Sequence, residues 1–248
     1  MPNCHALSST CKGTERASAV RWYSKACKLG DGNGCLSAGH FNTYGLYGAS
    51  IDQLAGVKLY ESACRQKVSD GCLYAAYMTI LMHEGKGAKE EKQLVDACKA
   101  KSTLACAFAG RVIGARAKSL PEMERARGML SKACHEKNAH GCAFLGEFLL
   151  KHKDLSVGNT PAQTFLERGC KGRIAEGCMG LASFFMEQAG TNKYTQIVVK
   201  HLTDACLYGE LGACDTLGRL YYEGKFIPVS YSSALFFARR GCAGRFGK

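Results

Sequence analysis

The chain has 248 residues, of which 46% are apolar, only four prolines, and a formal net charge of +12. This composition supports a packed interior and excludes a largely disordered chain. No uncharged apolar run reaches the roughly 18 residues that cross a bilayer, so the sequence predicts no transmembrane segment. The positive charge favours an acidic partner or an anionic membrane surface, with a basic, solvated surface as the simpler interpretation.

Residues 1–14 form an N-terminal segment ahead of the repetitive part of the chain. Cys4 and Cys11 lie in it, and a disulfide between them is one way to close a loop there. The first 25 residues lack the apolar stretch of a secretory signal, so we expect no export by that route. Ser9-Thr-Cys-Lys12 matches the S-x-x-K pattern of penicillin-binding enzymes, but S-D-N and K-T-G motifs do not follow. We therefore predict no catalytic residues.

From residue 15 onward, paired cysteines organise the sequence. Twelve of the 15 cysteines form six C-x7-C pairs whose first members are about 36 residues apart, and one more step of that length leads to Cys242. A fixed period of this size predicts an array of repeats, here one solenoid domain over residues 15–248. The pairs, which also mark the expected repeat junctions, are Cys27–Cys35, Cys64–Cys72, Cys98–Cys106, Cys134–Cys142, Cys170–Cys178 and Cys206–Cys214.

Each repeat is predicted to contain two antiparallel helices. Helix A begins at the second cysteine of a pair, with a small residue four positions later and a large apolar residue six positions later, a helical spacing. Helix B ends at the first cysteine of the next pair, with a small residue just before it and Tyr or Leu four positions before it. We call each position that recurs in every repeat a column. Small residues in a column allow neighbouring helices to approach closely, and large apolar residues fill the space between the helices. The sequence Ser119-Leu-Pro-Glu122 predicts a helix start between them.

Each C-x7-C pair therefore spans the corner between helix B of one repeat and helix A of the next. The short connection brings the two sulfurs within bonding reach, and the spacing differs from the C-x2-C of zinc sites. We therefore predict six disulfides, and an unpaired Cys242, because the chain ends before a partner eight residues further on.

At one junction a metal site is an alternative to the disulfide. His135 and His140, with Cys134 and Cys142, would give a metal ion two nitrogen and two sulfur ligands. The other loops repeat the cysteines without histidines, so a disulfide with two solvent-exposed imidazoles is favoured, and no metal site is predicted. No C-x-x-C-H motif for covalent haem occurs, and no cofactor is predicted, although noncovalent haem stays open. Nucleic-acid binding would rest on charge alone, so none is expected.

The 36-residue helix pair, its small columns and the C-x7-C junctions resemble the Sel-one-like repeat (SLR) family, α/α solenoids related to tetratricopeptide repeats. The likeness is strongest to cysteine-rich members, namely a mitochondrial cytochrome c oxidase assembly factor and secreted bacterial proteins. The resemblance implies an all-α, right-handed superhelix of about six helical hairpins. The family's G-x-G-V turn survives mainly as Gly85-Lys-Gly87-Ala88.

The resemblance also implies a function. Its first form is a non-catalytic scaffold, an accessory subunit or assembly factor of a respiratory-chain complex, whose concave face, lined by helix A, binds a protein partner. Fifteen cysteines without an export signal fit the mitochondrial intermembrane space. The alternative is a periplasmic or secreted bacterial protein with penicillin-binding or β-lactamase activity.

Overall fold

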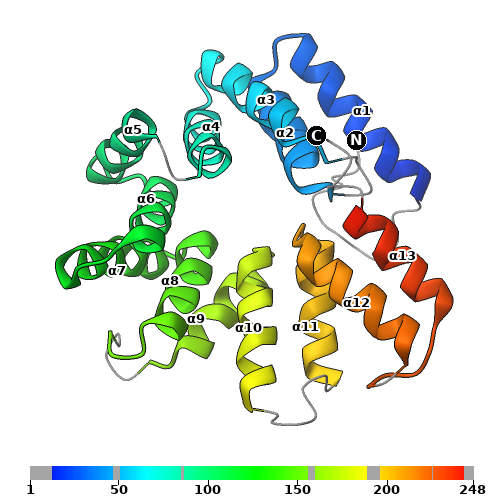
Figure 1. The fold of residues 1–248 in the computed structure, drawn as a ribbon. Helices are drawn as coiled ribbons and strands as arrows, with labels where there is room; N and C mark the ends of the chain where they lie inside the picture. Colours follow the sequence, from blue (N-terminus) through cyan, green and yellow to red (C-terminus); the bar gives the residue numbers. More distant parts are fainter. Residues whose placement is uncertain are drawn as a thin grey trace. The chain divides into compact units, whose positions relative to one another are not determined.

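The computed structural model describes residues 13–46, 51–84, 87–155, 160–188, 196–224 and 226–242, with side chains from residue 18. Within these ranges the chain forms thirteen α-helices and no strand. Successive helices pack as antiparallel pairs joined by short connections (Figure 1). The predicted all-α array of helical hairpins, joined by disulfides, is confirmed. No helix in the described part is long and apolar enough to cross a membrane.

The chain divides into two compact units, with the division after Met78. Unit 1 contains α1 (Gly13–Lys28), α2 (Gly32–Tyr44), α3 (Gln53–Arg65) and most of α4 (Ser69–Met82). Unit 2 continues with α5 (Ala88–Lys99), α6 (Thr103–Arg116), α7 (Leu120–His135), α8 (Ala139–Lys151), α9 (Ala162–Lys171), α10 (Ala175–Gln188), α11 (Gln196–Leu207), α12 (Leu211–Glu223) and α13 (Tyr231–Cys242). The even-numbered helices are the predicted helices A, and the odd-numbered ones are helices B.

The ends of several helices follow local sequence chemistry. At the start of α7, the Glu122 carboxylate accepts hydrogen bonds from the Ser119 hydroxyl at 3.0 Å and the Ser119 N–H at 3.3 Å. A hydrogen bond from the Lys118 N–H, together with the two from Ser119, lowers the pKa of Glu122. At the end of α12, Gly224 adopts a left-handed φ of 65° and its N–H donates to the Leu220 carbonyl. The sequence thus predicted the helix start at Ser119; Gly85 of the G-x-G-V turn lies outside the described residues.

The repeated columns form the core of both units. The residue four positions before the first cysteine is fully buried in five of the repeats, as Tyr60, Leu94, Leu130, Leu166 and Leu202. Opposite these side chains stand the small residues of helix A. A Cβ built on Gly110 would lie 2.8 Å from Leu130, and one on Gly146 would lie 2.6 Å from Leu166. The small columns are therefore needed because the neighbouring helix B presses its large residue against helix A.

Two glycines of unit 2 give substitutions with opposite expected effects. A Cβ at Gly169 would meet the Ala143 Cα at 2.6 Å and its N at 2.8 Å, whereas one at Gly128 on α7 meets nothing within 4 Å. Gly169→Ala should lower the free energy of unfolding by about 1–3 kcal/mol, because backbone must move. Gly128→Ala should raise it by about 0.5–1 kcal/mol through helix propensity. Urea denaturation of the two variants checks both signs; stabilisation by Gly169→Ala would contradict the packing described.

Candidate binding surface and the disulfide junctions

Each helix B ends in the same three-residue turn before the next helix A. The N–H of the central turn residue donates to the carbonyl of the first cysteine, and the next N–H donates to the residue before that cysteine, at 2.8–3.2 Å. Together these two bonds form a Schellman motif. The central residues have φ between 62° and 113° and are Gly30, Lys67, Lys101, Lys137, Arg173 and Gly209. The turn reverses the chain and brings the start of helix A against the end of helix B.

Four of the six central turn residues are Lys or Arg, which was not predicted. A left-handed conformation costs a residue with a side chain roughly 1–2 kcal/mol, so glycine would be the usual choice. A cation at this place lies beyond the C-terminal end of helix B, where the helix dipole favours positive charge. Four of the basic residues of the array are therefore explained by their place at the C-terminal end of a helix B.

All six C-x7-C pairs are disulfides in the structure. Their Cα–Cα distances run from 4.4 to 4.8 Å, which is the range that a disulfide requires. Each bond ties the last turn of helix B to the first turn of the next helix A. Because such bonds persist in oxidising surroundings, they indicate an oxidising compartment for the folded chain.

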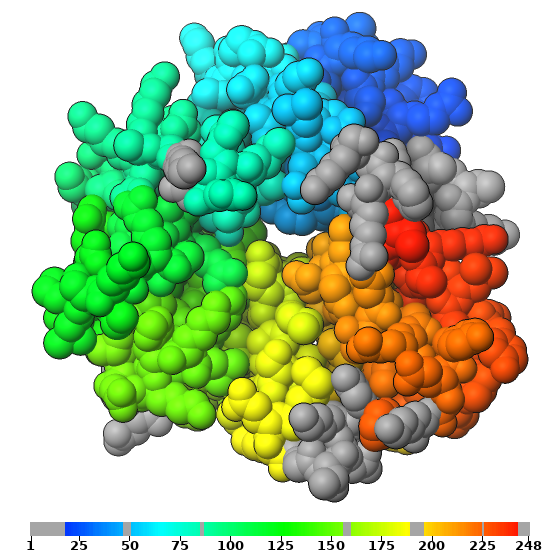
Figure 2. Space-filling view, in the orientation of Figure 1, coloured from blue at the N-terminus to red at the C-terminus, as the bar shows by residue number. Residues whose placement is uncertain are grey.

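In unit 2, the helices A named α6, α8 and α10 form an inner layer. The contacts of α6 with α8 and of α8 with α10 are more extensive than those that join α5 to α7 or α7 to α9 in the described part of the chain. An array whose one layer is more closely spaced curves toward that layer. The side chains of successive hairpins of unit 2 also pack against one another along the chain (Figure 2). The inner layer of α6, α8 and α10 is therefore the candidate binding surface.

An ion pair joins two helices across this layer. Arg111 of α6 contacts the Glu147 carboxylate of α8 at 2.5 Å, and their side chains are only 27% and 20% exposed. The Arg111 guanidinium also lies over the Phe144 ring, 5.2 Å from its centroid. A second cation, Lys151, reaches the same carboxylate at 3.2 Å. Two adjacent helices A are thereby held in register by partly desolvated charges.

Buried aromatic rings and a partly buried acidic side chain belong to the same layer. The His140 ring contacts the Phe108 and Phe144 rings, with centroids 5.4 and 5.9 Å apart. On α10, burial raises the pKa of Glu176, opposed by the nearby Arg111 charge and reinforced by Glu147. The exposed part of this layer therefore offers charges of both signs, and the aromatic rings of Phe108 and Phe144 are buried beneath it.

The Arg111–Glu147 pair should contribute measurably to stability. Arg111→Ala removes the ion pair and the contact with the Phe144 ring, and should lower the free energy of unfolding by about 1–2 kcal/mol. Lys99→Ala is the matched control, because the Lys99–Asp96 pair is 74% and 53% exposed and should matter by less than about 0.5 kcal/mol. Urea denaturation compares the two; equal losses would show that the inner pair contributes no more than a surface pair.

Unit 1 has its own buried polar cluster. The Tyr60 hydroxyl of α3 lies 2.9 Å from His40 Nδ1 of α2, and the His40 ring packs edge-on against Tyr74 at 4.5 Å. Burial lowers the pKa of His40 to about 4 and raises that of Tyr60. At neutral pH the imidazole is therefore uncharged, and the cluster serves as a hydrogen-bonded part of the core.

The remaining cysteine and histidine predictions have mixed outcomes. Cys242 is exposed and has no disulfide partner among the described residues, while Cys4, Cys11 and the Ser9–Lys12 stretch lie outside them. Because Cys134 and Cys142 are bonded, they offer no thiolates for a metal. His135 is exposed as expected, but His140 is not: it is partly buried because its ring contacts Phe108 and Phe144.

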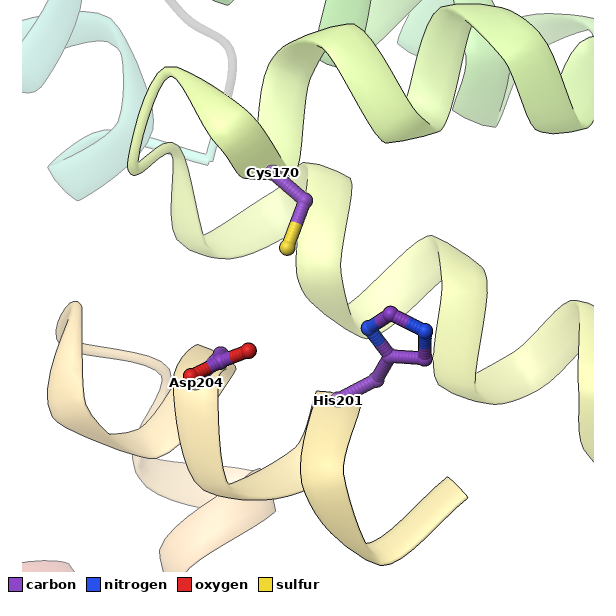
Figure 3. Close-up of side chains that lie close together, drawn as sticks. All are labelled: Cys170, His201 and Asp204. Atoms are coloured by element: carbon purple, nitrogen blue, oxygen red, sulfur yellow. The ribbon is translucent and has the colours of Figure 1, made fainter. Parts of the chain in front are cut away.

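One cluster was missed by sequence reasoning. The Cys170 sulfur, a ring nitrogen of His201 and a carboxylate oxygen of Asp204 lie within 4.8 Å of one another. Figure 3 shows these side chains converging from two neighbouring helices B, α9 and α11. All three are residue types that ligate metals, but Cys170 is bonded to Cys178 and so is no thiolate. The signal in the sequence was a histidine at a position that is Phe165 and Phe237 in neighbouring repeats.

Comparison with known proteins agrees with this architecture. The Sel1 repeat family model matches residues 15–31, 34–68 and 213–244. A Sel1 repeat protein from Oxalobacter formigenes aligns with a TM-score of 0.56 at 14% identity, over 92% of this chain and 94% of that protein. A protective antigen of uropathogenic Escherichia coli with an SLR fold aligns with a TM-score of 0.50 at 17% identity, over 90% of this chain.

The chain spans about half the length of the Escherichia coli antigen, 48%. No curated protein matches the chain. At these identities the solved structures establish the fold, and the family model covers about a third of the chain. The chain therefore has the fold of the Sel1 repeat protein, and its matched segments are similar to Sel1 repeats.

Proposed function

We propose that the chain is a non-catalytic scaffold that binds a protein partner through the inner layer of α6, α8 and α10. The main support is the chemistry of that layer, where the partly exposed Arg111 and Glu147 offer charges of both signs on helices held in register by their ion pair. Disulfides at every junction stiffen the array, so little order has to be gained on binding. Curved repeat arrays commonly use their inner face in this way.

The finer proposal concerns partner and compartment. Six disulfides fit the oxidative folding of the mitochondrial intermembrane space, and a positive net charge of +12 suits an acidic protein surface. In this proposal the partner is a respiratory-chain complex, with the chain as an accessory subunit or assembly factor. That both units act together as a single domain over residues 15–248 belongs to the same proposal.

A charge swap tests the binding surface without removing the ion pair. Arg111→Glu combined with Glu147→Arg keeps an attractive pair but reverses its orientation. The matched control is Glu124→Arg with Arg125→Glu on α7, a charge-neutral swap of two exposed residues on a helix B. Each tagged chain is used to capture partners from mitochondria in mild detergent, and the proteins are identified by mass spectrometry.

We expect the wild type and the α7 swap to recover the same complex, and the inner swap to lose it at least about tenfold, the scale of a 1.4 kcal/mol loss. Equal recovery by both swaps would overturn the inner layer as the binding surface. Recovery of a specific complex without respiratory-chain subunits would reject the mitochondrial proposal and leave the scaffold role in place.

A further inference from the structure

The Cys170–Cys178 disulfide has a different chemical setting from the other junctions of unit 2. His201 and Asp204 are three residues apart, one helical turn, on α11, and they lie against the end of α9 where Cys170 stands. Figure 3 shows the Cys170 sulfur and the two side chains directed into one small space. Cys170 is partly exposed, whereas Cys178 is fully buried. Of the two bonded cysteines, Cys170 is therefore the less buried and the one at which an incoming thiol is less hindered.

The repeat register shows why this setting is particular to one junction. His201 and Asp204 stand five and two residues before the first cysteine of the next pair, and a side chain at the second of these positions reaches the preceding helix end. Arg240, for example, donates to the Cys206 carbonyl at 3.0 Å. In the other repeats of unit 2 whose preceding disulfide also lies in unit 2, the two positions hold Met129 and Lys132, Phe165 and Arg168, and Phe237 and Arg240. None of those pairs contains a proton acceptor.

The imidazole of His201 is suited to accept a proton. Its Nδ1 atom is buried and has no hydrogen-bond partner, a state that costs free energy in a protein interior. The ring stacks on Phe185 with an interplanar angle of 4° and centroids 5.7 Å apart, which fixes its plane. Burial lowers the pKa of His201, while the Asp204 charge acts in the opposite direction. The uncharged ring thus has one unprotonated nitrogen that can accept a proton, beside a carboxylate that favours its protonated form.

We propose that Cys170–Cys178 is a thiol-exchange site in which His201 accepts the proton of an incoming thiol and Asp204 stabilises the imidazolium. The incoming sulfur forms a bond to the Cys170 sulfur, the bond between Cys170 and Cys178 breaks, and Cys178 leaves as a thiolate. The imidazolium then returns the proton to Cys178. The products are a mixed disulfide at Cys170 and a thiol at Cys178.

The substrate class is a thiol, and a dithiol completes the exchange. Its second thiol displaces Cys170 from the mixed disulfide, so the dithiol is oxidised to a disulfide while Cys170 and Cys178 are both reduced. The site thus supplies a base, His201, and a supporting carboxylate, Asp204, as in sites of nucleophilic catalysis. The nucleophile itself is the thiol of the substrate. This one disulfide of the array can then be opened while the other five stay bonded.

Limited reduction of the folded chain tests the proposal. The oxidised full-length protein is treated with dithiothreitol at pH 7, samples are quenched by acid and alkylated, and mass spectrometry gives the opening rate of each pair. We expect Cys170–Cys178 to open roughly a hundredfold faster than Cys206–Cys214, the lower end of general acid–base effects. It should also open faster than Cys64–Cys72, whose two cysteines are partly exposed as well. A rate no higher than that of Cys64–Cys72 would overturn the proposal.

Two variants separate proton acceptance from packing. His201→Phe installs the residue that stands at this register in two neighbouring repeats, and His201→Gln keeps a polar group without a comparable base. Both should slow the opening of Cys170–Cys178 roughly a hundredfold. The rates of the other five pairs should not change, which shows that the fold is intact. If either variant keeps the fast rate, polarity or exposure explains it and the base role is wrong. A variant in which all six disulfides open faster has lost its fold and is set aside. The proposal is then judged by whether Cys170–Cys178 opens faster than Cys64–Cys72 in the wild type.

Discussion

Reduction of the six disulfides is expected to unfold the chain at 25 °C. Each bond closes a loop of about nine residues, for which the chain-entropy relation gives about 2.5 kcal/mol, so six give about 15 kcal/mol as an upper figure. That sum is as large as the whole stability of a typical domain, about 5–15 kcal/mol. Loss of the circular dichroism at 222 nm on treatment with a phosphine reductant would be the expected signal.

Removal of a single disulfide should lower the stability by a fraction of this amount. Cys206 and Cys214 are fully buried and bonded, so replacing both by Ala should lower the free energy of unfolding by about 2–3 kcal/mol. Cys242→Ser is the control, because its side chain is exposed and unbonded among the described residues, and it should leave stability unchanged. A reduced chain that keeps its full helical signal and melting temperature would show that packing alone holds the array.

Acidification should destabilise unit 1 through His40. Its pKa is about 4 in the folded chain because the ring is buried, against 6.5 for an exposed histidine. A pKa lowered on folding means that the unfolded chain binds the proton more tightly. The stability contribution is therefore complete above about pH 6.5 and is lost as the pH falls toward 4. Between pH 7 and pH 5 the loss should be about 2 kcal/mol.

His40→Gln isolates this effect from the other titrating groups. Glutamine retains a polar partner for the Tyr60 hydroxyl but does not titrate, so the variant should be less stable at pH 7 and should lose about 2 kcal/mol less on going to pH 5. Urea denaturation at the two pH values measures the difference for both proteins. Parallel losses in wild type and variant would show that His40 is not the acid-sensitive group.

The repeat architecture could be predicted because the same residue types recur at the same positions of each repeat. Leu130 and Leu166 occupy one column and are buried, and the glycines opposite them occupy another. Every repeat presents the same physical problem, so each copy adds to the signal of the others. The capping sequence at Ser119 was predicted for a different reason, since its chemistry is local.

The chemistry of the surfaces could not be predicted in the same way. The Lys and Arg residues in left-handed turns oppose the usual glycine preference, so their conformation depends on the disulfide and the two bonds of the Schellman motif. The Arg111–Glu147 pair and the contacts of His140 join different repeats, and no single repeat records which residue faces which. His201 near Cys170 was detectable only as a departure from the column that holds Phe165 and Phe237.

Non-reducing peptide mapping of the purified chain tests the covalent junctions most directly. Protease digestion without reductant, with free thiols blocked beforehand, should yield linked peptides for each of the six C-x7-C pairs and a blocked Cys242. Blocked thiols at those twelve positions, or bonds between cysteines of different pairs, would contradict the disulfide-joined array on which the scaffold and the exchange site both depend.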